Sequence, residues 1–157
     1  MIDVLYARKL RKSAMDAPTC AEDCIFFHLA KANQVATRYW ANWIGALGVT
    51  PVQGLVLNFL HDNDRTTSGS LGRRVMLDSA TLTGVLDRLE SSGLLVREKH
   101  PEDRRAVLVC LTPAGRELAS RLYQCMQEAN AAFLAGHLSE EERAILKMLL
   151  RKLRRAE

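Results

Sequence analysis

The sequence predicts a mainly α-helical protein with one small β-hairpin. Apolar residues recur at spacings of three and four over several long stretches, which is the pattern of amphipathic helices. One run, AVLVCL at residues 106–111, is instead rich in residues that favour strands, and the polar tip HPEDR at residues 100–104 precedes it. The hairpin therefore interrupts a series of helices.

The sequence of the N-terminal half predicts three helices. Residues 4–15 form a basic amphipathic pattern that Pro18 ends, and residues 22–47 predict a long helix that Gly48 ends. Thr50 can cap a helix that begins at Pro51, where the missing N–H of proline costs nothing. We expect the polar residues 61–70 to be a connector.

Two helices joined by a short turn follow this connector. Residues 71–77 predict a short helix, which Thr67 or Ser68 could already begin, and Asp78 or Ser79 can cap the next helix. That helix ends at Gly93. Its apolar side chains share one face: Leu82, Val85, Leu86 and Leu89. This pair predicts a helix-turn-helix.

The hairpin and two further helices complete the predicted order. Residues 94–99 and 105–111 are the expected strands, and a hairpin directly behind a recognition helix is a wing. Thr112 and Pro113 begin a helix that continues to about Gly136. Ser139 and Glu142 have the spacing of a capping box, which predicts a last, leucine-rich helix.

This order of motifs resembles the MarR family of winged helix-turn-helix transcriptional regulators. The resemblance covers roughly residues 24–155 and rests on TLTGVLDRLE followed by SSGLL, on DRR within EDRRAVLVCLT, and on LTPAGREL. It implies a sequence-specific regulator, a homodimeric repressor that binds a pseudopalindromic operator in double-stranded DNA. It also implies that a small ligand, with an aromatic one as the candidate, releases the repressor from DNA.

The resemblance also implies a division of the single domain, residues 1–157. Residues 1–48 and 113–157 would form a helical dimerisation region, and residues 50–112 the winged DNA-binding lobe. The hydrophobic pattern also favours a dimerisation region, because the apolar stripes of the long first helix and the final helix are too wide for one small domain to cover. A twofold partner is the commonest solution.

The expected DNA contacts lie on the recognition helix and the helix before it. The front of the recognition helix offers Ser79, Ala80, Thr81 and Thr83, which are short enough to let the backbone approach base edges. Arg73 and Arg74 are candidates for phosphate contacts, with solvated surface arginines as the alternative. The resemblance implies an arginine at this point of the recognition helix in many relatives, where this chain has Gly84, so the chain lacks that candidate guanine contact.

The wing tip offers two more arginines, Arg104 and Arg105. An arginine on a projecting hairpin suits a narrow minor groove. The resemblance implies that one of the two enters that groove and that the preceding Asp103 holds the tip by a salt bridge. Which arginine has which role is open.

Three ideas compete for the signal that switches the protein. Aromatic rings beside cationic or imidazole groups suit an aromatic carboxylate, although the same spacing also suits a dimer core. The candidate effector residues lie on the long first helix: Phe27, His28, Arg38, Tyr39, Trp40 and Trp43. Cys24 lies near the position of the reactive cysteine of peroxide-responsive relatives, about two residues out of register, and a buried inert thiol is the alternative.

A metal site is the third idea, but we predict none. Cys20, Cys24 and His28 share a helical face, yet the outer two would be about 12 Å apart along a helix, so one ion cannot bind all three. The four cysteines form no CxxC pair.

Composition excludes several classes of protein. The net charge of +4 arises mostly from residues 1–12 and 146–157, so it is weak evidence for nucleic acid. The chain lacks a run of eighteen apolar residues and the pattern of a signal peptide, so we expect a cytoplasmic protein without a membrane partner. It shows no catalytic constellation and no cofactor motif, so we expect no enzyme. A winged-helix module that binds protein is the remaining alternative.

Overall fold

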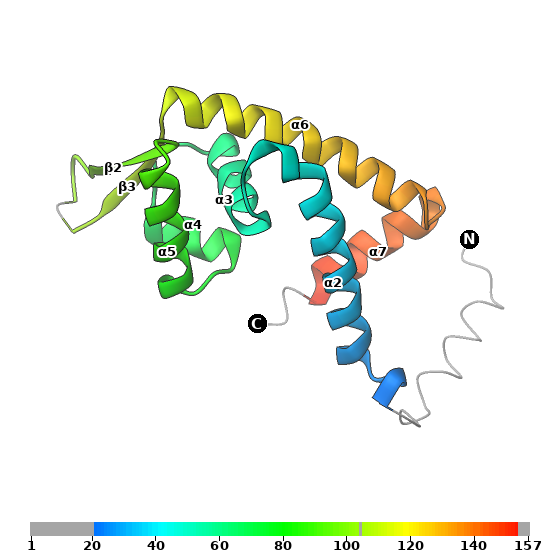
Figure 1. The fold of residues 1–157 in the computed structure, drawn as a ribbon. Coiled ribbons are helices and arrows are strands. Elements are labelled where there is room, and N and C mark those ends of the chain that lie inside the picture. The colour runs from blue at the N-terminus through cyan, green and yellow to red at the C-terminus, as the bar shows by residue number, and fades with distance from the viewer. Residues whose placement is uncertain (1–20, 104, 154–157) are drawn as a thin grey trace. The chain divides into compact units, whose positions relative to one another are not determined.

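The computed structural model describes residues 21–103 and 105–153 (Figure 1). The chain divides into two units, Met1–Arg38 and Tyr39–Glu157, each of which is described by itself. The helix expected over residues 4–15 lies outside the described residues, as does Cys20. Among the described residues no single helix is long and apolar enough to cross a membrane; Ile25–Leu47 and Pro51–Asp62 meet the length and composition criteria only as a bent pair.

The long first helix is confirmed, with breaks at both ends. A 3₁₀ turn, η1 (Ala21–Asp23), precedes α2 (Ile25–Ile44), and a second 3₁₀ turn, η2 (Gly45–Leu47), follows it. Gly48 then adopts a φ of 71°, which a glycine reaches without steric cost. The predicted stop at Gly48 therefore has the expected backbone cause.

Helix α3 (Pro51–Asp62) begins as the sequence predicts. The Thr50 amide donates to Gln53 Oε1 at 2.8 Å and the Gln53 amide donates to Thr50 Oγ1 at 3.4 Å, so a capping box satisfies two free N–H groups. Helix α3 packs against α6 (Pro113–Ala135), which crosses it in Figure 1. The two helices build the core with buried Val56, Leu57, Leu60, Ala119 and Leu122.

The predicted helix-turn-helix consists of α4 (Ser68–Val75) and α5 (Ser79–Ser91). Thr67 caps α4 by accepting a hydrogen bond from the Ser70 amide at 3.2 Å, and Asp78 caps α5. Between the helices Met76 has a φ of 56°, which gives a left-handed turn. The apolar face predicted for α5 is buried: Leu82, Val85, Leu86 and Leu89.

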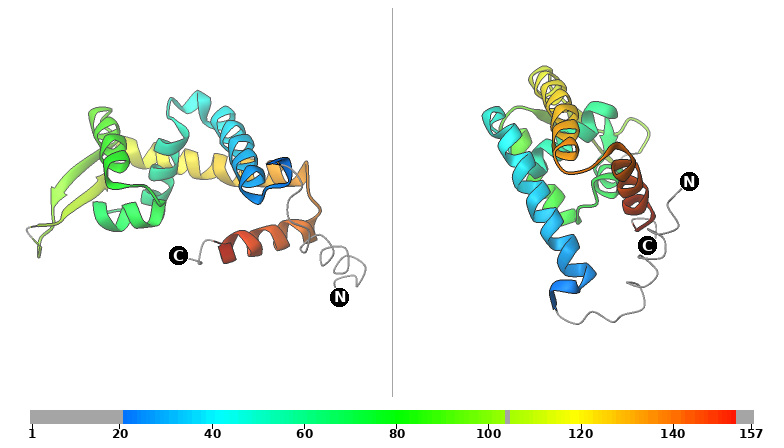
Figure 2. Two further views of the ribbon diagram at one scale, coloured as in Figure 1. Left: turned by 90° about the horizontal axis from the view of Figure 1, so that it is seen from below. Right: turned by 90° about the vertical axis from the view of Figure 1, so that its right-hand side faces the viewer.

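The wing contains three strands, one more than the sequence predicts. Strands β2 (Leu95–Lys99) and β3 (Val107–Leu111) form the expected hairpin, and β1 (Thr66–Thr67) pairs antiparallel with the other edge of β3. The expected connector at residues 61–70 therefore contains a strand and the start of α4. Figure 2 (left) shows the hairpin extending away from α4 and α5. The fold is thus mainly helical with a small wing, as predicted.

The C-terminal helices also follow the sequence. Thr112 caps α6 by accepting from the Gly115 amide at 3.0 Å, and Gly136 ends it. The Ser139 amide donates to Glu142 Oε2 at 2.9 Å, which confirms the capping box ahead of α7 (Glu140–Leu153). These bonds from Ser139 hold the pKa of the Glu142 carboxyl below its usual value. No residue of α7 is buried by the part of the chain that the structure describes.

Candidate nucleic-acid interface

The front of α5 is exposed to solvent. Ser79, Ala80, Thr81 and Thr83 are exposed, while the opposite face of the helix is buried in the core. A Cβ atom added to Gly84 would meet nothing within 4 Å, so this side of the helix has free space in front of it. Small side chains on an exposed helix start allow close approach to a base edge.

The threonine hydroxyls on this front already donate hydrogen bonds within the helix. Thr81 Oγ1 donates to Asp78 Oδ2 at 2.6 Å, and Thr83 Oγ1 donates to the Ser79 carbonyl oxygen at 2.7 Å. The bonds from Thr81 hold the pKa of the Asp78 carboxyl below its usual value, so this cap is ionised at neutral pH. The threonines therefore keep only acceptor lone pairs and a methyl group for a base.

The two arginines at the end of α4 lie in different surroundings. Arg73 is exposed and borders a cleft of about 520 Å³ between α4, α5 and the wing, where Leu77, Leu82 and Val107 supply apolar walls. The Arg74 guanidinium lies 5.1 Å from the centre of the Phe59 ring, a cation–π distance. Of the pair, Arg73 is thus the more open to a phosphate.

The wing tip is held by backbone hydrogen bonds to Asp103. The Arg105 amide donates to Asp103 Oδ1 at 2.9 Å, and the Ala106 amide donates to the Asp103 carbonyl oxygen at 3.0 Å. The Arg105 side chain is exposed. Asp103 therefore supports the tip through the main chain, and Arg104 lies outside the described residues.

One arginine that the sequence analysis missed joins the wing to the recognition helix. Arg97 Nη1 on β2 lies 2.8 Å from Asp87 Oδ1 and 2.6 Å from Glu90 Oε2, both on α5. The Arg97 amide also donates to Glu90 Oε1 at 3.1 Å. These bonds fix the angle between the two candidate DNA-reading elements.

Asp64 is a second missed residue, in the segment expected to be a plain connector. Its Oδ1 accepts a hydrogen bond from the Leu111 amide at 2.8 Å, and its Oδ2 forms an ion pair with Arg116 of α6. The neighbouring Arg65 pairs with Glu98 of β2 at 2.9 Å. The base of the wing is thus tied to both α6 and the β1 segment.

The predicted effector residues divide between the two units. In the first unit His28 and Arg38 are exposed on α2, and Phe27 lies edge-on to His28 at 6.1 Å between ring centres. In the second unit the Tyr39 ring lies 4.9 Å from that of Phe133 and 6.2 Å from that of Trp43. Trp40 packs against the core.

The described cysteines differ in accessibility. Cys24 is partly exposed at the start of α2, and Cys125 is partly exposed on α6. Cys110 is buried in β3, and burial, with a smaller contribution from the charge of Glu98, raises the pKa of its thiol.

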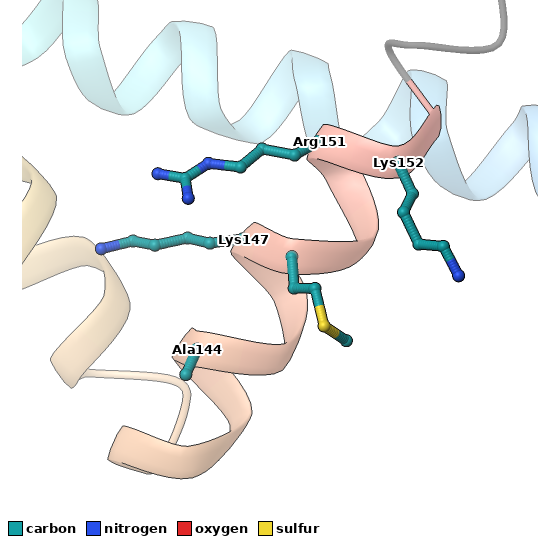
Figure 3. A pocket seen from close by; sticks show the side chains of 5 residues that line it. Ala144, Lys147, Arg151 and Lys152 are labelled. Atoms are coloured by element: carbon teal, nitrogen blue, oxygen red, sulfur yellow. The ribbon is translucent and has the colours of Figure 1, made fainter.

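A further hollow of about 390 Å³ lies on α7 (Figure 3). The Lys147 and Arg151 side chains extend from the same side of this helix, and Lys152 extends from another. The hollow is lined by surface side chains of this single helix, with Ala144 and Met148 beside the cations. It marks a basic stripe along α7.

An exposed helix start beside a projecting hairpin defines a winged helix-turn-helix protein. The model of the MarR family matches residues 49–107. The multiple antibiotic resistance protein MarR of Salmonella typhimurium is 32% identical over 121 residues, which are 77% of this chain and 84% of that protein. The chain belongs to the MarR family of transcriptional regulators.

Two solved structures extend the comparison over most of the chain. A probable transcriptional regulator from Pseudomonas aeruginosa is 38% identical, with a TM-score of 0.79 and coverage of 85% of this chain and 99% of that one. BpsR of Bordetella bronchiseptica, whose DNA binding is regulated by 6-hydroxynicotinic acid, is 30% identical, with a TM-score of 0.82 and coverage of 90% and 100%.

Proposed function

We propose that this regulator is a homodimeric DNA-binding repressor that leaves its operator when a small aromatic acid binds. The observation that carries the proposal is the exposed, small-residue front of α5 next to a wing that ends in arginines. The similarity to BpsR supports both DNA binding and control by an aromatic acid. The similar proteins named above are regulators, and we propose no catalytic activity and a cytoplasmic location for this chain.

The contacts with DNA follow from the chemistry of each position. Ser79, Ala80, Thr81 and Thr83 would face base edges in the major groove, where the threonine methyl groups suit the methyl group of thymine. Arg104 and Arg105 would reach the minor groove from the wing, with Asp103 holding the tip. Arg73 would contact phosphate; Arg74 would do so only at the cost of its contact with Phe59.

The exposed apolar side chains of the terminal helices support a second copy of the chain as the partner. Such a density of exposed large apolar residues is typical of an interface. On α7 they are Ile145, Leu146, Met148, Leu149, Leu150 and Leu153, and on α2 they include Ile25, Phe26, Phe27, Leu29 and Val35. We therefore assign residues 1–48 and 113–157 to dimerisation, although Ala119 and Leu122 of α6 also belong to the core of the winged lobe, residues 50–112.

The dimer gives the ligand a means of control. Two recognition helices read one face of DNA when they lie about 34 Å apart, which is one helical turn. A ligand that favours a different separation removes this match and lowers the affinity for DNA. We propose that the ligand draws its contacts from His28, Arg38, Tyr39, Trp40 and Trp43, whose rings and cationic groups suit an aromatic carboxylate. His28 and Trp43 lie about four helical turns apart on α2, so one small ligand contacts only some of these residues in each chain.

Control by oxidation is a second candidate, favoured by the partial exposure of Cys24. A thiol must be accessible to react with peroxide, and Cys24 meets that requirement while Cys110 does not. Modification at the start of α2 would then replace ligand binding as the signal.

The test is selection of DNA from a pool of short duplexes cut from the source genome, at several salt concentrations. We expect enrichment of a near-palindromic site by the wild type and a large loss of affinity in Arg104→Ala/Arg105→Ala. The opposite result, no selectivity and no effect of the double substitution, would reject the proposal and favour a protein-binding module.

A further inference from the structure

The tip of the wing is closed by a histidine. His100 Nδ1 accepts hydrogen bonds from two successive backbone amides, those of Glu102 and Asp103, each at 3.2 Å. The His100 amide donates to the Ala106 carbonyl oxygen at 3.1 Å, which anchors the histidine to the far side of the tip. The imidazole therefore takes the place that an asparagine or aspartate oxygen occupies in many turns.

This arrangement requires one protonation state. An imidazole nitrogen accepts a hydrogen bond only when it carries no proton, and in a protonated histidine both ring nitrogens are donors. A proton on Nδ1 would point at two N–H groups and remove both hydrogen bonds. The closed tip is therefore specific for neutral His100.

The tip also carries the residues that we assign to the minor groove. Asp103, whose amide His100 holds, in turn accepts the bond from the Arg105 amide at 2.9 Å. His100 thus begins a chain of hydrogen bonds that ends at a wing arginine. Release of the first bonds lets the backbone that carries Arg105 move.

We propose that His100 is a positioning residue for DNA binding, which holds the wing in its DNA-reading conformation only while the imidazole is neutral. This inference rests on the proposed function, because it assumes that the wing contacts DNA. It makes the wing a proton-sensitive element that is separate from the ligand site and from the cysteines.

The charges around His100 come from the hairpin itself. Lys99 precedes it on β2, and Glu102, Asp103 and Arg105 belong to the tip. On the facing strand, Val107 pairs with Lys99, and the preceding Ala106 bonds to His100, so β3 brings no charge opposite the imidazole. Among the described residues, the negative charges of Glu102 and Asp103 therefore balance the positive charges of Lys99 and Arg105.

The effect has a definite direction and size. Because DNA binding selects the neutral form, uptake of a proton by the free protein opposes binding, and affinity falls as the pH is lowered. We expect the affinity to fall about tenfold between about pH 7.5 and about pH 5.5.

The test compares three variants with the wild type on one selected duplex over that pH range. His100→Asn keeps an oxygen that can accept both amides and cannot be protonated, so it should bind as tightly as the wild type at the higher pH and lose the pH dependence. His100→Ala has no acceptor and should bind weakly throughout. His61→Asn, at an exposed histidine of α3 outside the proposed DNA contacts and dimerisation region, is the matched control and should keep the wild-type pH profile.

A measurement on free protein separates this inference from the proposed function. In NMR spectra the Glu102 and Asp103 amide signals should shift together with His100 titration, and should stay fixed in His100→Asn. Static amides in the wild type, or an unchanged pH profile for binding in His100→Asn, would overturn the role of His100. A wild type that binds no DNA while these amides titrate would instead overturn the proposed function.

Discussion

Nη1 of Arg97 in the wing lies 2.8 Å from Oδ1 of Asp87 on the recognition helix. The same nitrogen lies 2.6 Å from Glu90 Oε2, one turn further along α5. One guanidinium therefore binds two carboxylates of α5. The side chain of Arg97 is 27% exposed, whereas those of Asp87 and Glu90 are 58% and 38% exposed, so water screens both pairs, most of all the pair with Asp87.

Arg97→Gln should loosen the wing from the recognition helix. The change removes both ion pairs, and we expect unfolding free energy to fall by about 1 to 2 kcal/mol, with a further loss of DNA affinity. Urea denaturation of Arg97→Gln, Glu90→Gln and the double variant measures the coupling. Arg88→Gln, at an exposed arginine of the same helix, is the control, and an equal loss of stability there would contradict the assignment.

Two substitutions at Asp64 should separate its ion pair with Arg116 from its hydrogen bonds to backbone amides. Asp64→Asn removes the charge that pairs with Arg116 but keeps an oxygen for the Leu111 amide, so its cost should be about 0.5 kcal/mol. Asp64→Ala also leaves that amide without its acceptor, and should cost about 1 to 3 kcal/mol. Equal stability of the two variants would show that the Leu111 bond contributes nothing.

Local signals explain what the sequence predicted correctly. The caps at Thr50, Thr112 and Ser139 each depend on residues within three positions, so the chain encodes them in short patterns. The buried stripe of α5 follows from helical periodicity in the same way. These features placed most of the helices and the hairpin.

Long-range pairing explains what the sequence did not predict. Thr66 pairs with Val109, and Asp64 binds Leu111, across more than forty residues, so neither short segment shows a periodic pattern of its own. The role of His100 has no sequence signal either, because only the turn geometry brings two amides to its ring. The partners of the site residues therefore required the fold.

A methyl group at Gly115 should be poorly tolerated. A Cβ atom at position 115 would overlap the carbonyl oxygen of Leu94. At this point the start of α6 lies against the turn between α5 and β2. Relief requires a backbone shift, so Gly115→Ala should cost about 3 kcal/mol, measured as a lower midpoint in urea. Gly84→Ala is the matched control, because its Cβ meets open space and alanine favours helix by about 1 kcal/mol.

A charge on the apolar face of α7 should separate the proposed dimer. Leu149 is 48% exposed in the single chain, and Leu149→Glu would bury a carboxylate in the interface. We expect a monomer in analytical ultracentrifugation and loss of operator binding. Ala144→Glu introduces the same charge on the side of α7 that carries Lys147 and Arg151 in Figure 3, and should remain dimeric. A dimeric Leu149→Glu would argue against this face.

The burial of each cysteine should determine how fast it reacts with iodoacetamide. Burial raises the pKa of the Cys110 thiol, so this thiol stays protonated at about pH 8. Because iodoacetamide reacts with the thiolate, Cys110 should need a more alkaline pH to react than an ordinary thiol needs. Cys24, which is partly exposed, should be labelled faster, as mass spectrometry of timed samples would show.

The difference in reactivity between Cys24 and Cys110 also tests whether oxidation is the signal that releases the operator. If peroxide releases the operator through Cys24, then Cys24→Ser should abolish the release and Cys110→Ser should leave it intact. Release that persists in Cys24→Ser would remove this thiol from consideration, and rapid labelling of Cys110 in the folded protein would show that β3 opens, because the thiolate can form only after water reaches it.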